Sequence, residues 1–359
     1  MQQIIEANRT FTYVTIPSVR PIGNTRTIRL REEEGANGSL IEPFIDLNFP
    51  GLRGRPGNPP VLQTSHFMLK YGFHTRVARA SSSPILPPTN RFGFELVKTL
   101  WDNTSNTAAF SFRQPDNRNW FRQNDRDLHL LYLILEAQHY SNGQASGVYK
   151  DTIQPVNDYE NGDFSTNFFS PKLIYSHLDR SDCSLLSLGA GYRVDFGATD
   201  GFLKFLPEQE RSYGRHRLWA LFQWRSAPFE LFKWLNNLPM PFRWLTLGRF
   251  KQYSVDNQSE YVVKSLYILS LRWEAEYILG NLDRFRLSNR HRFGHHLYLE
   301  LSPMRSRSIA LLFHVYSGRD YLNIRYDDIV FSWQVGISAA LSKYKPIGFR
   351  SSDAIVEKL

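Results

Sequence analysis

The sequence contains little cysteine and no long apolar run. Its 359 residues include one cysteine, Cys183, so an intramolecular disulfide is excluded, as is a zinc site built from several cysteines. No segment approaches the roughly 18–20 consecutive apolar residues that a transmembrane helix needs. Residues 1–14 also lack the basic stretch followed by an apolar stretch that marks a secretory signal peptide. A disulfide-stapled fold and a bundle of membrane helices are therefore not expected.

Aromatic residues and positive charge are both plentiful. Aromatic side chains make up 14% of the chain, which is typical of barrels with aromatic girdles, and the formal net charge is +9. A basic balance fits nucleic acid or the anionic headgroups of an envelope membrane equally well. Lysine and arginine are spread along the chain rather than gathered in one stripe, however, and this disfavours a nucleic-acid partner.

Apolar and polar residues alternate with a period of two over much of the chain, the pattern of strands with unlike faces. The alternation is clearest over 185–196, 266–279 and 331–338, and weaker candidates lie at 66–78, 91–101, 106–113 and 243–253. It predicts an all-β protein, a transmembrane antiparallel β-barrel of about twelve strands with lipid outside and a polar lumen. A soluble β-sandwich or barrel is the alternative, because alternation does not say which face is inside.

Proline and glycine divide the chain. The run Asn48–Pro60 holds four prolines and three glycines, so we expect residues 1–62 to form an irregular leader, followed by the barrel over 63–342 and a C-terminal extension over 343–359. A barrel of the bacterial outer membrane has to be exported. We therefore expect a signal peptide to have been removed or to lie upstream of the sequence.

The segment Leu135–Gly143 carries the first candidate for chemistry. Residues two apart in a strand point to the same side, so His139 and Ser141 lie together, close enough for an imidazole to take a proton from a hydroxyl. They share their side with Leu131 and Leu133. In a soluble fold the pair would be buried in the core. On a barrel it would face lipid, whose ester bonds are an obvious substrate. A short helix over 127–138 is an alternative interpretation that the parity disfavours.

A third residue comes from the following segment, where Asp163 and Asn167 have the same parity. If residues 142–162 connect a hairpin, Asn167 lies beside His139 and can hold its tautomer. Each residue also has an ordinary structural interpretation, because His–x–Ser pairs in strands are mostly structural and Asn–Gly is a common turn. His295 and His296 are adjacent in a strand, so they point to opposite faces and are poor joint metal ligands.

The motif His139–Gly143 resembles the active-site motif of the outer-membrane phospholipase A family. Val315–Gly318 and Tyr321–Asp327 look like the family's penultimate strand and turn, and Phe331–Leu341 looks like its last strand. In outline the resemblance runs from residue 66 to 342. It implies a twelve-stranded barrel in the bacterial outer membrane that hydrolyses the acyl esters of glycerophospholipids, depends on calcium and is activated by dimerising.

The resemblance also implies roles for single residues. Ser141 would be the nucleophile, His139 the general base and Asn167 its orienting partner. The side chain of Asp163 and the backbone carbonyl of Gln144 would bind Ca²⁺, which prefers such oxygen ligands. The partners would be membrane phospholipids and, as a possibility, a second copy in a homodimer. A barrel of the same ancestry that has lost catalysis and serves a structural or binding role is the alternative.

Overall fold

The computed structural model describes the strands and their nearest flanks. The described residues are 12–22, 39–53, 65–75, 77–78, 89–102, 127–142, 164–179, 184–197, 213–230, 249–252, 262–280, 282, 289–303, 309–319 and 329–339. Within these ranges no helix is long and apolar enough to cross a membrane.

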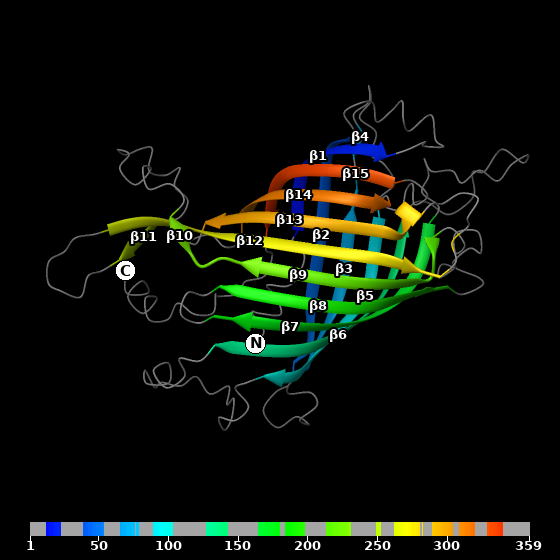
Figure 1. Cartoon of the computed structure of the whole chain (residues 1–359), viewed down its shortest axis with the longest axis horizontal. Coiled ribbons are helices and arrows are strands. Elements are labelled where there is room, and N and C mark those ends of the chain that lie inside the picture. The colour runs from blue at the N-terminus through cyan, green and yellow to red at the C-terminus, as the bar shows by residue number, and fades with distance from the viewer. Residues whose placement is uncertain are drawn as a thin grey trace, which may run out of the picture.

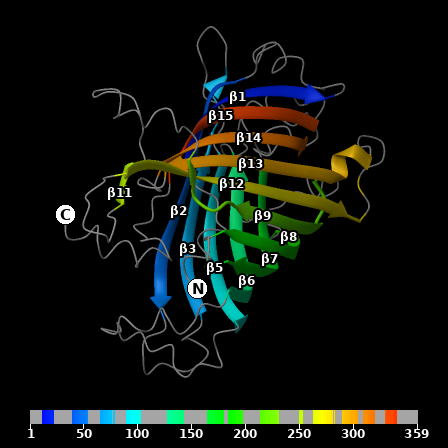
Figure 2. The same cartoon turned by 60° about the vertical axis from the view of Figure 1, so that its left-hand side comes forward.

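The described strands form one antiparallel sheet that curls round on itself (Figures 1 and 2). Hydrogen-bonded neighbours follow the order β1-β15-β14-β13-β12-β9-β8-β7-β6-β5-β3-β2. In addition, β1 pairs with β2 over three residues, which brings the two ends of this order together. Mostly sequential, antiparallel neighbours of this kind are the topology of an up-and-down barrel. The total of about twelve strands for the barrel stays a prediction.

The strands are long, as membrane crossing requires. Their bounds are β1 Thr12–Ile22, β2 Ser39–Arg53, β3 Ser65–His74, β5 Thr89–Asp102, β6 Leu128–Asn142, β7 Phe164–Leu178, β8 Leu185–Phe196, β9 His216–Arg225, β12 Val262–Leu279, β13 Phe293–Pro303, β14 Ile309–Arg319 and β15 Ile329–Ala339. The short strands β4 (Val77–Ala78), β10 (Phe229–Glu230) and β11 (Arg249–Gln252) pair at the margins of the sheet, and a 3-10 turn, η4 (Asn289–Arg292), precedes β13.

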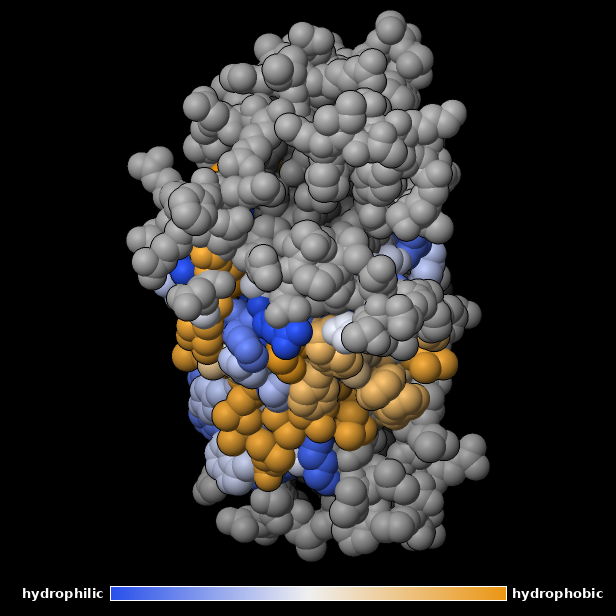
Figure 3. All heavy atoms as spheres, turned by 90° about the vertical axis from the view of Figure 1, so that its right-hand side faces the viewer, coloured by the Kyte–Doolittle hydropathy of each residue, from blue (hydrophilic) through white to orange (hydrophobic). Residues whose placement is uncertain are grey.

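The two faces of the sheet decide between the membrane and the soluble alternatives. Along β15 the polar residues Ser332 and Gln334 are fully buried, whereas Trp333 and Val335 are 43% and 49% exposed. The same division holds on β14, where His314 is buried and Leu311 is 62% exposed. Hydrophobic residues accordingly gather on the described surface (Figure 3). A soluble barrel would bury the opposite set, so the prediction of lipid outside and a polar lumen is confirmed.

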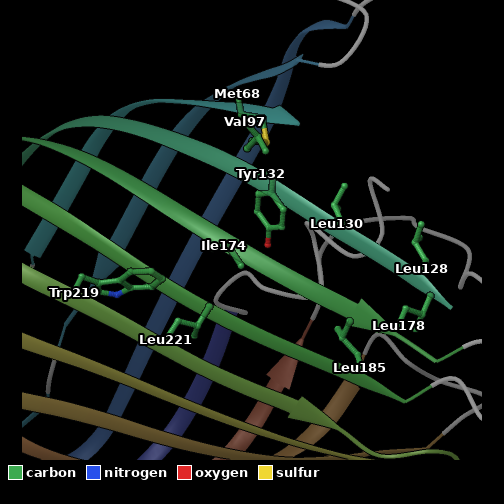
Figure 4. Packing of buried hydrophobic residues seen from close by; sticks show 10 residues of the cluster. All are labelled: Met68, Val97, Leu128, Leu130, Tyr132, Ile174, Leu178, Leu185, Trp219 and Leu221. Atoms are coloured by element: carbon green, nitrogen blue, oxygen red, sulfur yellow. The ribbon is translucent and has the colours of Figure 1, made fainter. Parts of the chain in front are cut away.

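Charged residues fill part of the lumen as ion pairs. Lys70 Nζ lies 2.9 Å from Glu95 and 3.5 Å from Glu136, and Lys172 Nζ lies 2.7 Å from the other oxygen of Glu136. These four side chains come from β3, β5, β6 and β7, so the network joins neighbouring strands on their inner side. Near one end of the same strands the inner face is apolar instead, with Val97 drawn above Tyr132 and leucines at the strand ends (Figure 4).

The structure differs from the sequence-based expectation over residues 1–62. They were expected to be irregular, yet β1 and β2 lie in this range and belong to the sheet. Both strands were not predicted because they contain Pro17, Pro21 and Pro50. Proline cannot donate a ladder hydrogen bond and is normally a sign that a strand is interrupted. The predicted strand at 106–113 and the C-terminal extension over 343–359 lie outside the described residues.

Candidate active site on the outer wall

The candidate site lies where β6 ends and β7 begins. Along β6, Glu136, Gln138 and Tyr140 are buried on the inner side, so His139 and Ser141 point outward, and both are partly exposed. The sequence predicted this parity and disfavoured a helix over 127–138. Residues 128–138 of that segment lie in β6. The register places His139 directly opposite Asn167 of β7, and Ser141 opposite Ser165.

Asn167 links three strands at this point. Its Oδ1 atom lies 2.9 Å from Nδ1 of His139, and its Nδ2 atom donates to the backbone carbonyl of Phe196 at 3.3 Å. Phe196 is the residue of β8 opposite Asn167, so its carbonyl is held by the sheet. Asn167 is 8% exposed although it has the outward parity. Its amide lies between the ring of His139 and the carbonyl of Phe196.

This arrangement fixes the chemistry of the imidazole. The carbonyl of Phe196 accepts only, so the amide nitrogen of Asn167 has to face it and the amide oxygen has to face His139. That oxygen in turn requires a hydrogen on Nδ1. In the neutral ring, Nε2 then carries the lone pair and can accept a proton from a nearby hydroxyl, as a general base does.

Two hydroxyls share the outward side with His139. Ser141 follows it by two residues on β6, and Ser165 is its diagonal neighbour on β7; both are partly buried. Among the described residues Ser141 makes no hydrogen bond to His139. The sequence-based prediction missed the carbonyl of Phe196, because a backbone carbonyl leaves no signal in a sequence. The spacing of Ser165 to Asn167 gave Ser165 the same parity, but no role was predicted for it.

The outward face of β6 and β7 sets the depth of the site. Between His129 and His139 every outward residue of β6 is apolar: Leu131, Leu133, Leu135 and Ala137. Ten residues of strand span about 33 Å along the strand axis. At a tilt of roughly 40° this is a height of about 25 Å, the height of the apolar band of outer-membrane barrels. His139 and Asn167 therefore lie at one border of the apolar band.

The two expected calcium ligands, Asp163 and Gln144, lie outside the described residues. In chain order Asp163 directly precedes Phe164, whose register partner is Asn142, the neighbour of Ser141. Within the described residues no group of three or more histidine, cysteine, aspartate or glutamate side chains is arranged to hold a metal ion. His295 and His296 do point to opposite sides, as predicted: His295 contacts Phe293 on the outer face, and His296 pairs with His314 inside.

An antiparallel barrel with an apolar outer wall and a polar lumen defines the class: an outer-membrane β-barrel. Solved structures carry the comparison further. An active-site mutant of outer membrane phospholipase A from Escherichia coli superimposes with a TM-score of 0.50 at 13% sequence identity, over 92% of this chain and 90% of that one. The calcium-bound dimer of the phospholipase from Salmonella typhi gives 0.50 at 13% identity, over 94% and 96%. The chain therefore shares the fold of outer membrane phospholipase A.

Comparison of the sequence with family models and with curated proteins finds no match.

Proposed function

We propose that the chain is an outer-membrane phospholipase that hydrolyses the acyl esters of glycerophospholipids with Ser141, His139 and Asn167. The observation that carries the proposal is the hydrogen bond of 2.9 Å between His139 and Asn167 on the lipid-facing wall. A lipid-exposed imidazole, held in one tautomer by a partner that is itself held by the backbone, is arranged as the general base of a Ser–His–Asn mechanism needs to be.

The reaction proceeds in two steps at this site. Nε2 of His139 takes the proton of Ser141, and Oγ of Ser141 attacks the ester carbonyl of a lipid at the edge of the apolar band. When the tetrahedral intermediate collapses, the imidazolium returns the proton to the leaving lysolipid oxygen, and the acyl group stays on Ser141. A water molecule deprotonated by His139 then hydrolyses this acyl ester. Asn167 keeps the imidazole oriented throughout without placing a carboxylate in an apolar surrounding.

The proposal includes calcium because two residues offer oxygen atoms of the kind that Ca²⁺ prefers. Asp163 and the carbonyl of Gln144 supply hard oxygen atoms, and both flank the described pair Asn142 and Phe164 in chain order. A bound Ca²⁺ would supply positive charge for the oxyanion of the intermediate. The Salmonella typhi phospholipase is a dimer with bound calcium in its crystal structure. Calcium dependence and a homodimer are therefore parts of the proposal for this chain.

Hydrolysis of a phospholipid in mixed micelles tests the proposal. The refolded full chain is assayed with Ca²⁺ or with chelator, beside Ser141→Ala, Ser165→Ala and the control Ser317→Ala, an outward serine of β14 far from β6. We expect calcium-dependent release of fatty acid that Ser141→Ala abolishes and Ser317→Ala leaves unchanged. If Ser165→Ala abolishes it instead, the nucleophile is Ser165 and the assignment of Ser141 is wrong. A folded wild type without hydrolysis in either condition would favour an inactive barrel.

A further inference from the structure

A second polar cluster lies on the outer wall at the opposite border of the apolar band. His129 of β6 is directly opposite His177 of β7, and their rings stack with centroids 4.6 Å apart and 5° between planes. Nδ1 of His129 lies 2.7 Å from the hydroxyl of Tyr175. Nε2 of His177 lies 3.2 Å from a carboxylate oxygen of Asp127. The side chains of His177 and Asp127 are 31% and 43% exposed, so the cluster faces the surroundings of the barrel.

We propose that this cluster binds the phosphodiester of a membrane lipid, and that binding goes together with the addition of one proton to His177. The proposal is independent of catalysis, because it concerns the border of the apolar band that lies away from His139. Two histidines, a tyrosine and an exposed aspartate are costly to place against lipid tails, yet at the border they meet the headgroups.

The hydrogen-bond roles explain the coupling to a proton. The carboxylate of Asp127 accepts only, so Nε2 of His177 carries a hydrogen. In the neutral ring Nδ1 of His177 is then an acceptor, and among the described residues it makes no hydrogen bond. A phosphodiester oxygen is also an acceptor, so it cannot bind there. Once a proton is added to Nδ1, the ring donates to the phosphodiester, and its charge lies between two anions, the carboxylate and the phosphate.

The stacked ring of His129 limits the site to one proton. Two imidazolium rings 4.6 Å apart would repel each other, and Asp127 supplies one negative charge to the pair. A neutral His129, held by Tyr175, instead offers its ring face to the charged His177. His129 and Tyr175 therefore position the charged ring, and His177 makes the contact with the phosphate.

Among the described residues, few other charged groups lie on the elements next to the cluster. On β5, Lys98 has the outward side but lies opposite Leu133, further along the band, and Asp102 has the parity of the lumen. After β7 comes Asp179, whose backbone bonds to Ser184. On the described part of β8, Leu186 lies opposite His177 and carries no charge. Asp127 is thus the carboxylate in contact with the stacked pair.

Neighbouring side chains favour a lipid over free phosphate. Trp101 of β5 is 49% exposed opposite Leu131, and Leu173 of β7 is 43% exposed, both on the band beside the cluster. A ligand whose phosphate binds His177 therefore has apolar surface for its acyl chains along the same two strands. Free phosphate would gain nothing from that surface.

The test measures the protonation of His177 by nitrogen NMR of histidine-labelled full chain, with the signal assigned through His177→Gln. The chain is compared in dimyristoylphosphatidylcholine nanodiscs and in dodecyl maltoside micelles, neither of which carries net charge. We expect the ratio of protonated to neutral His177 near neutral pH to be at least threefold higher in the nanodiscs. His295, an outward histidine at the other border, is the internal control and should not change.

Two further arms separate the explanations. Asp127→Asn keeps a hydrogen-bond acceptor but removes the charge, and it should abolish the difference between nanodiscs and micelles. Inorganic phosphate added to the micelles should leave His177 unchanged. The proposal is overturned if His177 is equally protonated in both media, if His295 rises to the same extent, or if inorganic phosphate alone reproduces the rise.

Discussion

Nδ1 of His139 and Oδ1 of Asn167 lie 2.9 Å apart across two neighbouring strands, and the amide of Asn167 is oriented by the carbonyl of Phe196 on a third. The tautomer of His139 thus depends on a backbone group of β8. Because β8 is separated from β6 by β7, the pairing of these strands is itself part of the site.

Replacing Asn167 should therefore impair catalysis more than folding. We expect Asn167→Ala to lower kcat by about 10²-fold, within the range that an oriented general base contributes. The KM for the lipid should change little, because Asn167 acts through His139. Kinetics in mixed micelles measure this. Asn90→Ala is the matched control, an outward asparagine of β5 that lies opposite Ser141 and bonds to Tyr71. Equal losses in the two variants would contradict the role of Asn167.

A charge in the middle of the apolar band should destabilise the barrel in a bilayer. Leu173 is 43% exposed and lies between the two polar borders on β7. We expect Leu173→Arg to lower the free energy of unfolding by about 2–4 kcal/mol, and Ser317→Arg at the border by about 0–1 kcal/mol. Denaturant unfolding from lipid vesicles measures both. Similar values for the two substitutions would mean that Leu173 does not face hydrocarbon.

Breaking the ion pairs of the lumen should be costly as well. Glu136 is 7% exposed and its two oxygens contact Lys172 at 2.7 Å and Lys70 at 3.5 Å. Glu136→Gln leaves these cations without their shared carboxylate, so we expect a loss of about 3–5 kcal/mol in the free energy of unfolding. Glu276→Gln is the control, because Glu276 is 39% exposed in its pair with Arg217. The double variant Glu136→Leu, Lys172→Met should recover part of the loss.

Gly93 supports the strand that carries His139. It lies opposite Gln138, and a Cβ atom there would come within 2.1 Å of the carbonyl oxygen of Ala137 and 2.6 Å of the Cα atom of Gln138. Gly93→Ala therefore has to displace β6 next to His139. We expect a loss of about 1–3 kcal/mol in stability, as for other overpacked sites, together with reduced hydrolysis.

Gly72→Ala is the matched control for that substitution. Its Cβ atom would meet the Cβ atom of Arg91 at 3.5 Å, an ordinary contact. Stability and hydrolysis should stay near wild type in this variant. Equal effects of the two alanine substitutions would show that the close approach at Gly93 is not what the site depends on.

The sequence predicted the fold where alternation was strong and failed where proline interrupted it. The windows 185–196 and 266–279 are found in β8 and β12, and the parity of His139 and Ser141 on β6 is as expected. β1 was missed because Pro17 and Pro21 interrupt its alternation, and no local signal reveals the pairing with β15 at the far end of the described strands. Which face is inside could not be determined from alternation either, since both solutions have the same period.

For the site, parity placed Asn167 and His139 on the same side, and the sequence predicted that they lie side by side if residues 142–162 connect a hairpin. The register of β6 and β7 confirms this position. The roles of Ser141, His139 and Asn167, and of Asp163 and Gln144 as calcium ligands, stay predictions. Tautomers and the orientation of an amide depend on partners such as Phe196, which belongs to a different strand and could be placed only by the register of three strands together.

The pairing of β1 with β15 has a consequence for how the barrel is made. The first and last described strands are neighbours over eleven residues, from Thr12 opposite Ala339 to Ile22 opposite Ile329. Their contact cannot form before β15 has been synthesised, and contacts so distant in sequence form slowly. Until then both edges of the growing sheet stay open to other chains. The barrel wall that carries His139 can therefore close only after β15 has been made, and its two open edges can pair with other chains in the interval.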